Sequence, residues 1–280
     1  MFYTGTISIF SVKYFILNDI VKKLKQESIP VGSIFNVTSE ILCNKTVINK
    51  ENVKPIFEHV PKHLRPVSDD QFWNSLAGLI DGEGHFSSKQ QLVIVFHSSD
   101  AYLAYYIKER LGFGKVKKVK DKNAFLLIIA STEGLEKIVN LILNLSKDLK
   151  NHWLAGFSDA DASFQIKVLH RSNIVEVRLN FQIDQKKDNI LLLIKNFLGG
   201  NIGYISTQDT YYYGSTSFGS AKNVINYFDY FHLLSSKHNN YLKWRKVYLI
   251  IKNRDHLNRD GLEKIIKLKD TMNRLSNTAV

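Results

Sequence analysis

The chain has 280 residues, with 38 Lys and Arg against 26 Asp and Glu, which gives a formal net charge of +12. This length allows one large domain or two ordinary ones, and 44% hydrophobic with 12% aromatic residues excludes a wholly disordered or collagen-like chain. Cys43 is the only cysteine, which excludes an intramolecular disulfide framework and a Cys-rich zinc module. Because Lys13 interrupts the most apolar stretch, no membrane span is expected. The positive charge favours a polyanionic partner, most commonly nucleic acid, and the alternative is a basic enzyme kept soluble by its lysines.

Residues 1–70 are set apart by their prolines. Pro30, Pro55, Pro61 and Pro66 are the only prolines in the chain, and all of them lie in this part. Proline interrupts regular helices and strands, so residues 1–70 are predicted to form an irregular or separately organised arm. Its start is poor in arginine and has the pattern of neither a secretory signal nor a transit peptide. The sequence suggests no function for this arm.

From residue 71 onward the chain contains an internal repeat. Residues 76–84, Leu-Ala-Gly-Leu-Ile-Asp-Gly-Glu-Gly, recur 78 positions later (154 − 76) as residues 154–162, Leu-Ala-Gly-Phe-Ser-Asp-Ala-Asp-Ala. We therefore divide the rest of the chain into a first repeat, residues 71–150, and a second repeat, residues 151–280.

The first repeat is predicted to begin with a helix that contains residues 76–82. Strands follow, then a helix near residues 103–111, a second pair of strands and a helix over residues 135–145. Both later helices have apolar residues at the i, i+3, i+4, i+7 spacing of an amphipathic helix, namely Leu103, Ala104, Ile107 and Leu111, then Leu135, Ile138, Val139, Ile142 and Leu145.

The second repeat shows the same order more clearly. Apolar and polar residues alternate over residues 164–168 and 175–183, which predicts two half-buried strands joined by a hairpin turn at residues 170–173. A helix over residues 190–198, a hairpin formed by residues 204–207 and 211–218, and a helix over residues 224–231 follow. A final helix is predicted from an N-cap near Asn258 to Met272. Each unit is thus an αββαββα repeat of the α+β class, with one sheet face covered by helices and one polar face.

Small residues recur at helical spacing in both copies of the motif, including Gly78 and Gly156. Glycine destabilises a helix interior by about 1 kcal/mol, so its presence requires a reason. Two helices lined with small residues can bring their backbones nearly into contact. We expect the two motif helices to pair with each other about a pseudo-twofold axis.

Acidic residues end both predicted motif helices: Asp81 and Glu83 in the first, Asp159 and Asp161 in the second. A helix C-terminus carries partial negative charge, so carboxylates there are unfavourable unless something compensates. A divalent cation held by carboxylate, water and phosphate oxygens would do so. Paired helices would bring the acids together, as metal-assisted phosphodiester hydrolysis requires. The alternative is that the acids cap neighbouring helices or are simply solvated.

The repeated nonapeptide closely resembles the signature of the LAGLIDADG homing endonucleases and intron maturases, in their single-chain, two-motif form. The likeness covers residues 71–275 and is strongest at residues 181–188 and 233–237. The resemblance implies a monomer with two pseudo-symmetric halves, each laying a curved antiparallel sheet into the major groove of double-stranded DNA. It further implies a staggered double-strand break made with Mg²⁺ (or Mn²⁺). Together with the many Phe, Tyr, Lys, Asn and Ile residues, which are typical of an AT-rich genome, it implies a gene in a group I intron of the mitochondrion.

The resemblance also assigns roles to individual residues. Glu83 and Asp161 match the metal ligands, and Asp81 and Asp159 match structural acids that fix the helix ends. Gln185 and Lys237 match peripheral active-site positions. His97 takes the place of Gln185 in the first repeat when Asp100 is aligned with Asp188.

Candidate DNA-binding residues follow from the chemistry of the side chains. Arg recognises guanine, and Asn and Gln recognise adenine, so the polar strand face of the second repeat could read base edges through Gln165, Lys167, Arg178, Asn180 and Gln182. The lysines at 115, 117, 118, 120 and 122, beginning with Lys115 and Lys117, would bind phosphate without sequence information. The alternative is an ordinary solvated sheet face.

Three features depart from the family pattern. Glu83 to Asp100 spans 17 residues (100 − 83) against 27 from Asp161 to Asp188 (188 − 161), so the first hairpin is predicted to be short. The connection from Leu145 to Trp153 is also short, and Ala162 replaces a closing glycine where positive φ could be required. The rival function is therefore a maturase that binds its host intron RNA without cutting DNA.

Overall fold

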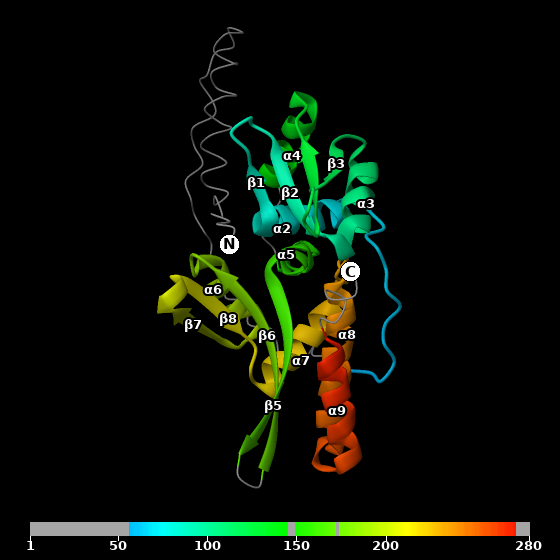
Figure 1. Cartoon of the computed structure of the whole chain (residues 1–280), viewed down its shortest axis with the longest axis vertical. Helices are drawn as coiled ribbons and strands as arrows, with labels where there is room; N and C mark the ends of the chain where they lie inside the picture. Colours follow the sequence, from blue (N-terminus) through cyan, green and yellow to red (C-terminus); the bar gives the residue numbers. More distant parts are fainter. Residues whose placement is uncertain (1–55, 145–148, 172–173, 273–280) are drawn as a thin grey trace.

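The computed structural model describes residues 56–144, 149–171 and 174–272 (Figure 1). The first repeat forms, in chain order, α2 (Asp69–Glu83), β1 (Gly84–Phe86), β2 (Leu92–His97), α3 (Ala101–Leu111), β3 (Lys115–Lys118), β4 (Ala124–Ile129) and α4 (Thr132–Asn144). A short 3-10 turn, Ser98–Asp100, precedes α3. The predicted αββαββα order of the first repeat is confirmed.

The second repeat has the same order and continues into two further helices. It forms α5 (Trp153–Asp161), β5 (Ala162–Arg171), β6 (Ile174–Gln185), α6 (Asn189–Leu198), β7 (Asn201–Ile205), β8 (Thr210–Gly214), α7 (Phe218–Phe228), α8 (Lys237–Lys252) and α9 (Arg259–Thr271). Residues 172 and 173 of the predicted hairpin turn lie outside the described residues, as do residues 145–148 of the connection between the repeats.

Each repeat contains one four-stranded antiparallel sheet. The strand orders are β1-β2-β4-β3 and β5-β6-β8-β7, so the two sheets have equivalent topologies. In Figure 1 the paired helices α2 and α5 lie between the two sheets. Two hydrophobic clusters result, one around Phe72 and the helix-covered face of the first sheet, and one around Trp153 and Trp244 in the second repeat. The α+β class with two pseudo-symmetric halves is confirmed.

Glycines let the two motif helices touch through their backbones. A Cβ on Gly78 would lie 1.9 Å from the carbonyl oxygen of Trp153, and one on Gly156 would lie 1.8 Å from that of Ser75. Further along, a Cβ on Gly82 would lie 2.3 Å from the Cβ of Ala160. The contacts advance together along both helices, so α2 and α5 run in the same direction. Their C-termini therefore lie at the same end of the pair.

The structure corrects several local expectations. The strand predicted over residues 211–218 ends at Gly214, because Ser217 caps α7 by accepting a hydrogen bond from the backbone N–H of Ser220. Helix α7 ends at Phe228, before Phe231. Ala162 has φ −86° and Gly84 has φ −75°, so no left-handed conformation is required where Ala162 replaces glycine. The short first hairpin is confirmed, with 3 residues in β1 against 10 in β5.

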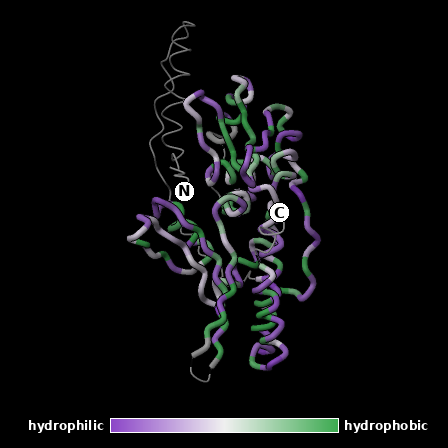
Figure 2. Tube along the Cα trace, in the orientation of Figure 1, coloured by the Kyte–Doolittle hydropathy of each residue, from purple (hydrophilic) through white to green (hydrophobic). Residues whose placement is uncertain are grey.

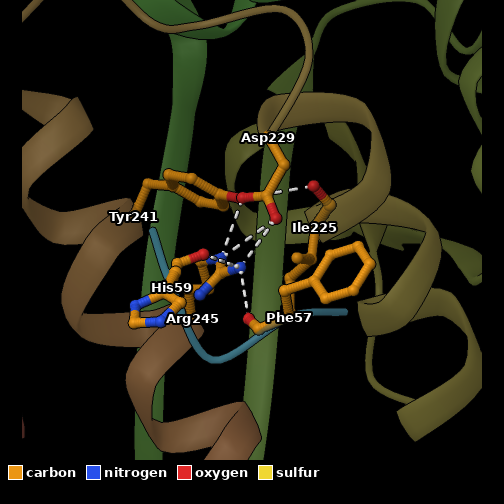
Figure 3. A network of polar contacts seen from close by, with 6 residues as sticks. All are labelled: Phe57, His59, Ile225, Asp229, Tyr241 and Arg245. Atoms are coloured by element: carbon orange, nitrogen blue, oxygen red, sulfur yellow. Dashed lines mark hydrogen bonds and ion pairs between the residues drawn. The ribbon is translucent and has the colours of Figure 1, made fainter. Parts of the chain in front are cut away.

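Residues 56–67, which we call the strap, contain no helix or strand and run from the second repeat to the first. Figure 3 shows how the strap is held at α8: the Arg245 side chain, 1% exposed, forms an ion pair with Asp229 and donates to the backbone carbonyl of Phe57 at 2.8 Å. The strap ends at Ser68, whose hydroxyl caps α2. Residues 56–67 of the predicted arm are therefore irregular and pack on both repeats, whereas Asp69 and Asp70 already belong to α2.

No helix among the described residues is long and apolar enough to cross a membrane.

Candidate active site

The end of the helix pair brings the two motif acids into one place. A Cβ on Gly82 would lie 3.1 Å from a carboxylate oxygen of Asp161, and Glu83 follows Gly82 directly. Glu83 is the last residue of α2, and Asp161 is the last residue of α5. The predicted convergence of one acid from each repeat is therefore present in the structure.

Burial destabilises the ionised form of both carboxyl groups. Burial, together with the negative charge of Asp161, raises the pKa of Glu83 to about 7, and the positive charge of Lys237 opposes this shift. Burial also raises the pKa of Asp161, against the effects of Lys237 and of a hydrogen bond from Gln185. Two carboxyl groups held in a partly buried site without enough compensating charge have the electrostatics of a cation site.

Gln185 and Lys237 both reach this site, from different elements of the second repeat. Gln185 is the last residue of β6, and its side-chain amide donates to a carboxylate oxygen of Asp161 at 2.5 Å. Lys237 is the first residue of α8, and its ammonium group donates to the backbone carbonyls of Ser158 and Ala160. These carbonyls belong to the last turn of α5, where cations are favourable. Burial lowers the pKa of Lys237, while the nearby carboxylates favour its charged form.

Asp159 and Asp81 hold the helices that carry the site. The carboxylate of Asp159 is buried and accepts hydrogen bonds from the backbone N–H groups of Leu234 and Ser235, at 2.8 and 2.9 Å, and from the Ser235 hydroxyl. It thereby fixes the segment just before Lys237. Asp81 accepts a hydrogen bond from the indole N–H of Trp153 at 2.9 Å, which ties α2 to the start of α5.

Asp100 also supports the site, although the sequence indicated only that it precedes a helix. It belongs to the first repeat, yet its carboxylate accepts from the backbone N–H of Ser236 at 2.6 Å and from the Ser236 hydroxyl at 3.1 Å. The start of α8, and with it Lys237, is therefore held by one acid from each repeat. The similarity of residues 233–237 to the family was the only sequence signal for this contact.

His97 does not occupy the place that corresponds to Gln185. Gly84 pairs with Ile94 and Ala162 pairs with Ile183, so the strand register makes Phe96 the counterpart of Gln185. Phe96 is buried in the core, whereas His97 is exposed and its ring contacts the hydroxyl of Ser99 at 2.9 Å. The strand register therefore differs by one residue from the alignment through Asp100 at this position.

The polar face of the second sheet carries a network of amides. The Asn180 amide donates to the side-chain oxygens of Gln165 and Gln182, at 3.3 and 3.1 Å, and Asn180 itself is only 6% exposed. Lys167 and Arg178 lie opposite each other near the middle of this hairpin, and both are exposed. Arg178 also pairs with Glu176. The five predicted residues thus share one face, with Asn180 inside the amide network and the two cations next to it along the hairpin.

Lys115 and Lys117 lie on β3, at the edge of the first sheet, and both are exposed. They are far along the sheet from the carboxyl pair, since β3 is separated from β1 by two strands. Among the described residues, no group of three or more His, Cys, Asp or Glu side chains forms a ready metal cage. A cation at Glu83 and Asp161 would therefore need further ligands from water or substrate.

Known proteins resemble this chain in sequence. A family described as LAGLIDADG endonuclease matches residues 76–148 and 154–248, more than half of the chain. A cox1 intron-2 37.2 kDa protein of Schizosaccharomyces pombe is 55% identical over 89% of this chain and 86% of its own length. The intron-encoded DNA endonuclease aI3 of Saccharomyces cerevisiae is 24% identical, over 73% of this chain and 69% of its own length. A probable intron-encoded endonuclease 4 of Neurospora crassa is 25% identical over 70% of this chain, which spans only 43% of that protein.

Solved structures agree with the fold. The meganuclease I-SmaMI bound to uncleaveable DNA superimposes with a TM-score of 0.61 at 24% identity, over 72% of this chain and 99% of that one. The LAGLIDADG meganuclease I-CpaMI bound to uncleaved DNA gives a TM-score of 0.62 at 21% identity, over the same shares of the two chains. With its two motif copies on touching helices and one terminal acid from each at a common site, this chain belongs to the LAGLIDADG endonuclease family.

Proposed function

We propose that this protein is a site-specific double-strand DNA endonuclease of the intron-homing type, which hydrolyses phosphodiesters with a divalent metal held by Glu83 and Asp161. The observation that carries the proposal is the position of these two acids at the shared end of two touching helices, with Lys237 beside them. The pair lies at the centre of the pseudo-symmetric molecule. A duplex that contacts both repeats would therefore present its backbone to both acids.

The chemistry of the donor groups fits a hard divalent cation. Both acids end helices whose C-terminal carbonyls point the same way, and both carboxyl pKa values are raised. Oxygen ligands of this kind suit Mg²⁺ or Mn²⁺, with the remaining positions filled by water and phosphate. When bound, the metal would supply an activated water and stabilise charge on the phosphate.

The surrounding residues have separate tasks in this proposal. Gln185 orients the Asp161 carboxylate through its amide, which keeps one oxygen directed toward the site. Lys237 contributes positive charge where phosphate would approach, and its anchoring on Ser158 and Ala160 limits its movement. Asp159 keeps Lys237 in place without facing the substrate.

The DNA would lie across the two sheets, with the chain acting as a monomer because it contains both halves of the site. On the second sheet, Lys167 and Arg178 are exposed near the middle of the long hairpin, and Gln165 and Gln182 flank Asn180 nearer the helices. Lys115 and Lys117 would contact phosphate on the first sheet. The net charge of +12 adds long-range attraction to the duplex.

The relatives point to the setting of the gene. Several are named as intron-encoded endonucleases, and the one that is 55% identical is named for the second intron of cox1. Together with an amino-acid composition typical of AT-rich genes, this supports a mitochondrial group I intron as the location of the gene. The target would then be the intronless version of the same locus.

The direct test is cleavage of a plasmid that carries the intronless locus, with Mg²⁺ or Mn²⁺. We expect a staggered double-strand break, lost in Glu83→Gln and in Asp161→Asn. Asp121→Asn is the matched control, because Asp121 is exposed and its positive φ of 58° is tolerated by Asn. If the protein binds the locus but cuts it with neither metal, the endonuclease proposal is wrong.

A second candidate is a maturase that binds its host intron RNA without cleaving DNA. The short first hairpin favours it, since 3 residues in β1 offer less surface to a duplex than the 10 of β5. Here the assay is splicing of the host intron at physiological Mg²⁺ with and without protein. Efficient splicing of the RNA alone would count against this function.

A further inference from the structure

The first sheet has an apolar face whose side chains lie outside the core cluster of the first repeat. The strand register places Val93 opposite Ile128 and Val95 opposite Leu126, and directly opposite residues point to the same side of a sheet. We call these four side chains the apolar face. The neighbouring positions Leu92, Ile94, Phe96, Leu127 and Ile129 point to the other side and are buried in the core of the first repeat.

None of the four residues of the apolar face is a member of that core cluster or packs against it. Val95, Leu126 and Ile128 are half-buried, and Val93 is 7% exposed in the middle of the sheet. Figure 2 shows β2 and β4 as continuously hydrophobic, whereas β5 and β6 alternate along their length. A strand that is apolar on both sides requires a second partner beyond its own core.

The second sheet carries different chemistry at the equivalent positions. With Ile94 matched to Ile183 by register, Val93 corresponds to Gln182 and Val95 corresponds to Asp184. Gln182 belongs to the amide network that can bond base edges. The first sheet offers no comparable donors or acceptors at its centre. The two halves of the molecule therefore cannot recognise a duplex in the same way.

The rim of the apolar face favours a polyanion over a protein segment as its occupant. Lys115 lies opposite Ile128 and Lys117 lies opposite Leu126, so both lysines border the face, and both are exposed. His85 borders it on the other side, opposite Val93. No strand residue on this side of the first sheet is acidic. The face thus combines apolar side chains at its centre with positive charge at its edge.

One group in the major groove of DNA fits an apolar surface between phosphate-binding lysines, namely the 5-methyl group of thymine. We propose that the first repeat reads a thymine-rich half-site through methyl contacts to the apolar face, while the second repeat reads its half-site by hydrogen bonding. This inference rests on the proposed DNA-binding function and adds the base composition of one half of the target.

Replacing thymine by deoxyuridine tests the inference, because it removes the methyl group and keeps every hydrogen-bonding group. The full-length protein is first used to select its binding site from randomised duplexes in Ca²⁺, so that cleavage is not needed. Dissociation constants are then measured with deoxyuridine in one half-site or the other. We expect the dissociation constant to rise roughly fourfold for each contacted thymine that is replaced in the first-repeat half-site, which corresponds to the burial of one methyl-sized group. We expect the dissociation constant to change less than twofold when deoxyuridine is placed in the second-repeat half-site.

Variants assign the effect to the face. Leu126→Gln should abolish the loss of affinity caused by deoxyuridine at one or two positions. Tyr212→Gln, at the position that matches Leu126 in the second sheet, should leave that loss unchanged. Thermal melting checks that Leu126→Gln folds, and Val95→Thr, which keeps the side-chain shape, is the second variant. Equal sensitivity of both half-sites, or insensitivity of both, would overturn the inference. Absence of any selected duplex would instead refute the proposed function.

Discussion

The contact between α2 and α5 leaves no room for a methyl group, and Gly156→Ala probes it directly. The new Cβ would lie 1.8 Å from the carbonyl oxygen of Ser75 and 3.0 Å from the backbone nitrogen of Leu79. Contacts of a Cβ below 3.0 Å are essentially never found, so the helices must separate by at least 1.2 Å at this point (3.0 − 1.8). Both obstacles are backbone atoms, which no change of side-chain rotamer can move.

The size of the effect follows from two opposing contributions. Overpacking destabilises proteins by about 1–3 kcal/mol, and we take the upper end because the neighbour is backbone. Alanine is about 1 kcal/mol better than glycine inside a helix, which offsets part of the loss. A net loss of about 2 kcal/mol should lower Tm by about 4–8 °C for a protein of this size. A displacement of about 1 Å between Glu83 and Asp161 should also slow cleavage by about 100-fold.

The measurements are thermal melting of Gly156→Ala and its cleavage rate at a temperature where it is fully folded. Gly219→Ala is the matched control, because Gly219 also lies in a helix and a Cβ there would meet nothing within 4 Å. The control should keep or slightly raise Tm. If Gly156→Ala melts with the parent protein and cuts equally fast, the helices are not packed as described and our account of the site is wrong.

Three further predictions concern charged groups. Arg245→Met should lower the free energy of unfolding in urea by about 3–5 kcal/mol, since it leaves the Asp229 carboxylate without its cation; a loss below about 1 kcal/mol would contradict this. Glu83 keeps its proton up to about pH 7 in the folded state against 4.5 ordinarily, so its contribution to stability is lost as pH rises through this range. In metal-free buffer Glu83→Gln should therefore be more stable than the parent protein by about 2 kcal/mol at pH 8 and equally stable at pH 4.5. Equal Tm values of the two proteins at pH 8 would refute the raised pKa of Glu83. Asp100→Ala should lower the free energy of unfolding by about 1–2 kcal/mol, because it removes the two hydrogen bonds to the start of α8. Asp188→Ala, at an N-cap without a side-chain hydrogen bond, should lower it by under about 0.5 kcal/mol. Equal losses in the two variants would contradict the cross-repeat contact.

Most of the fold was predictable because the spacing of apolar residues along the chain indicates which segments form helices and which form strands. The alternation in residues 175–183 and the helical spacing of Leu103, Ile107 and Leu111 each gave the correct element. Helix α8 was missed, although its buried residues Tyr241, Trp244 and Tyr248 have helical spacing. Arg245 interrupts that apolar stripe, and only the tertiary partner Asp229 explains why an arginine is buried there.

The site was predictable to the extent that the motif itself carries it. The positions of Glu83, Asp161 and Lys237 follow from the repeat and the family resemblance, and the structure brings them together. The mismatch between His97 and Gln185 shows the limit of alignment by spacing, because sheet register, not chain distance, decides which residues correspond. The support of α8 by Asp100 required tertiary contacts that no local pattern contains.

The strap has a consequence for the order of events during synthesis. Phe57 leaves the ribosome early, but its hydrogen-bond partner Arg245 is made 188 residues later. At a typical elongation rate of about 5–20 residues per second, the segment waits roughly ten seconds or more before its docking surface exists. The first repeat can fold in that interval, whereas residues 56–59 can dock only after α8 has been made. A nascent chain that stops before α8 should therefore expose residues 56–59 to protease, whereas Arg65 and Pro66 can already contact the first repeat.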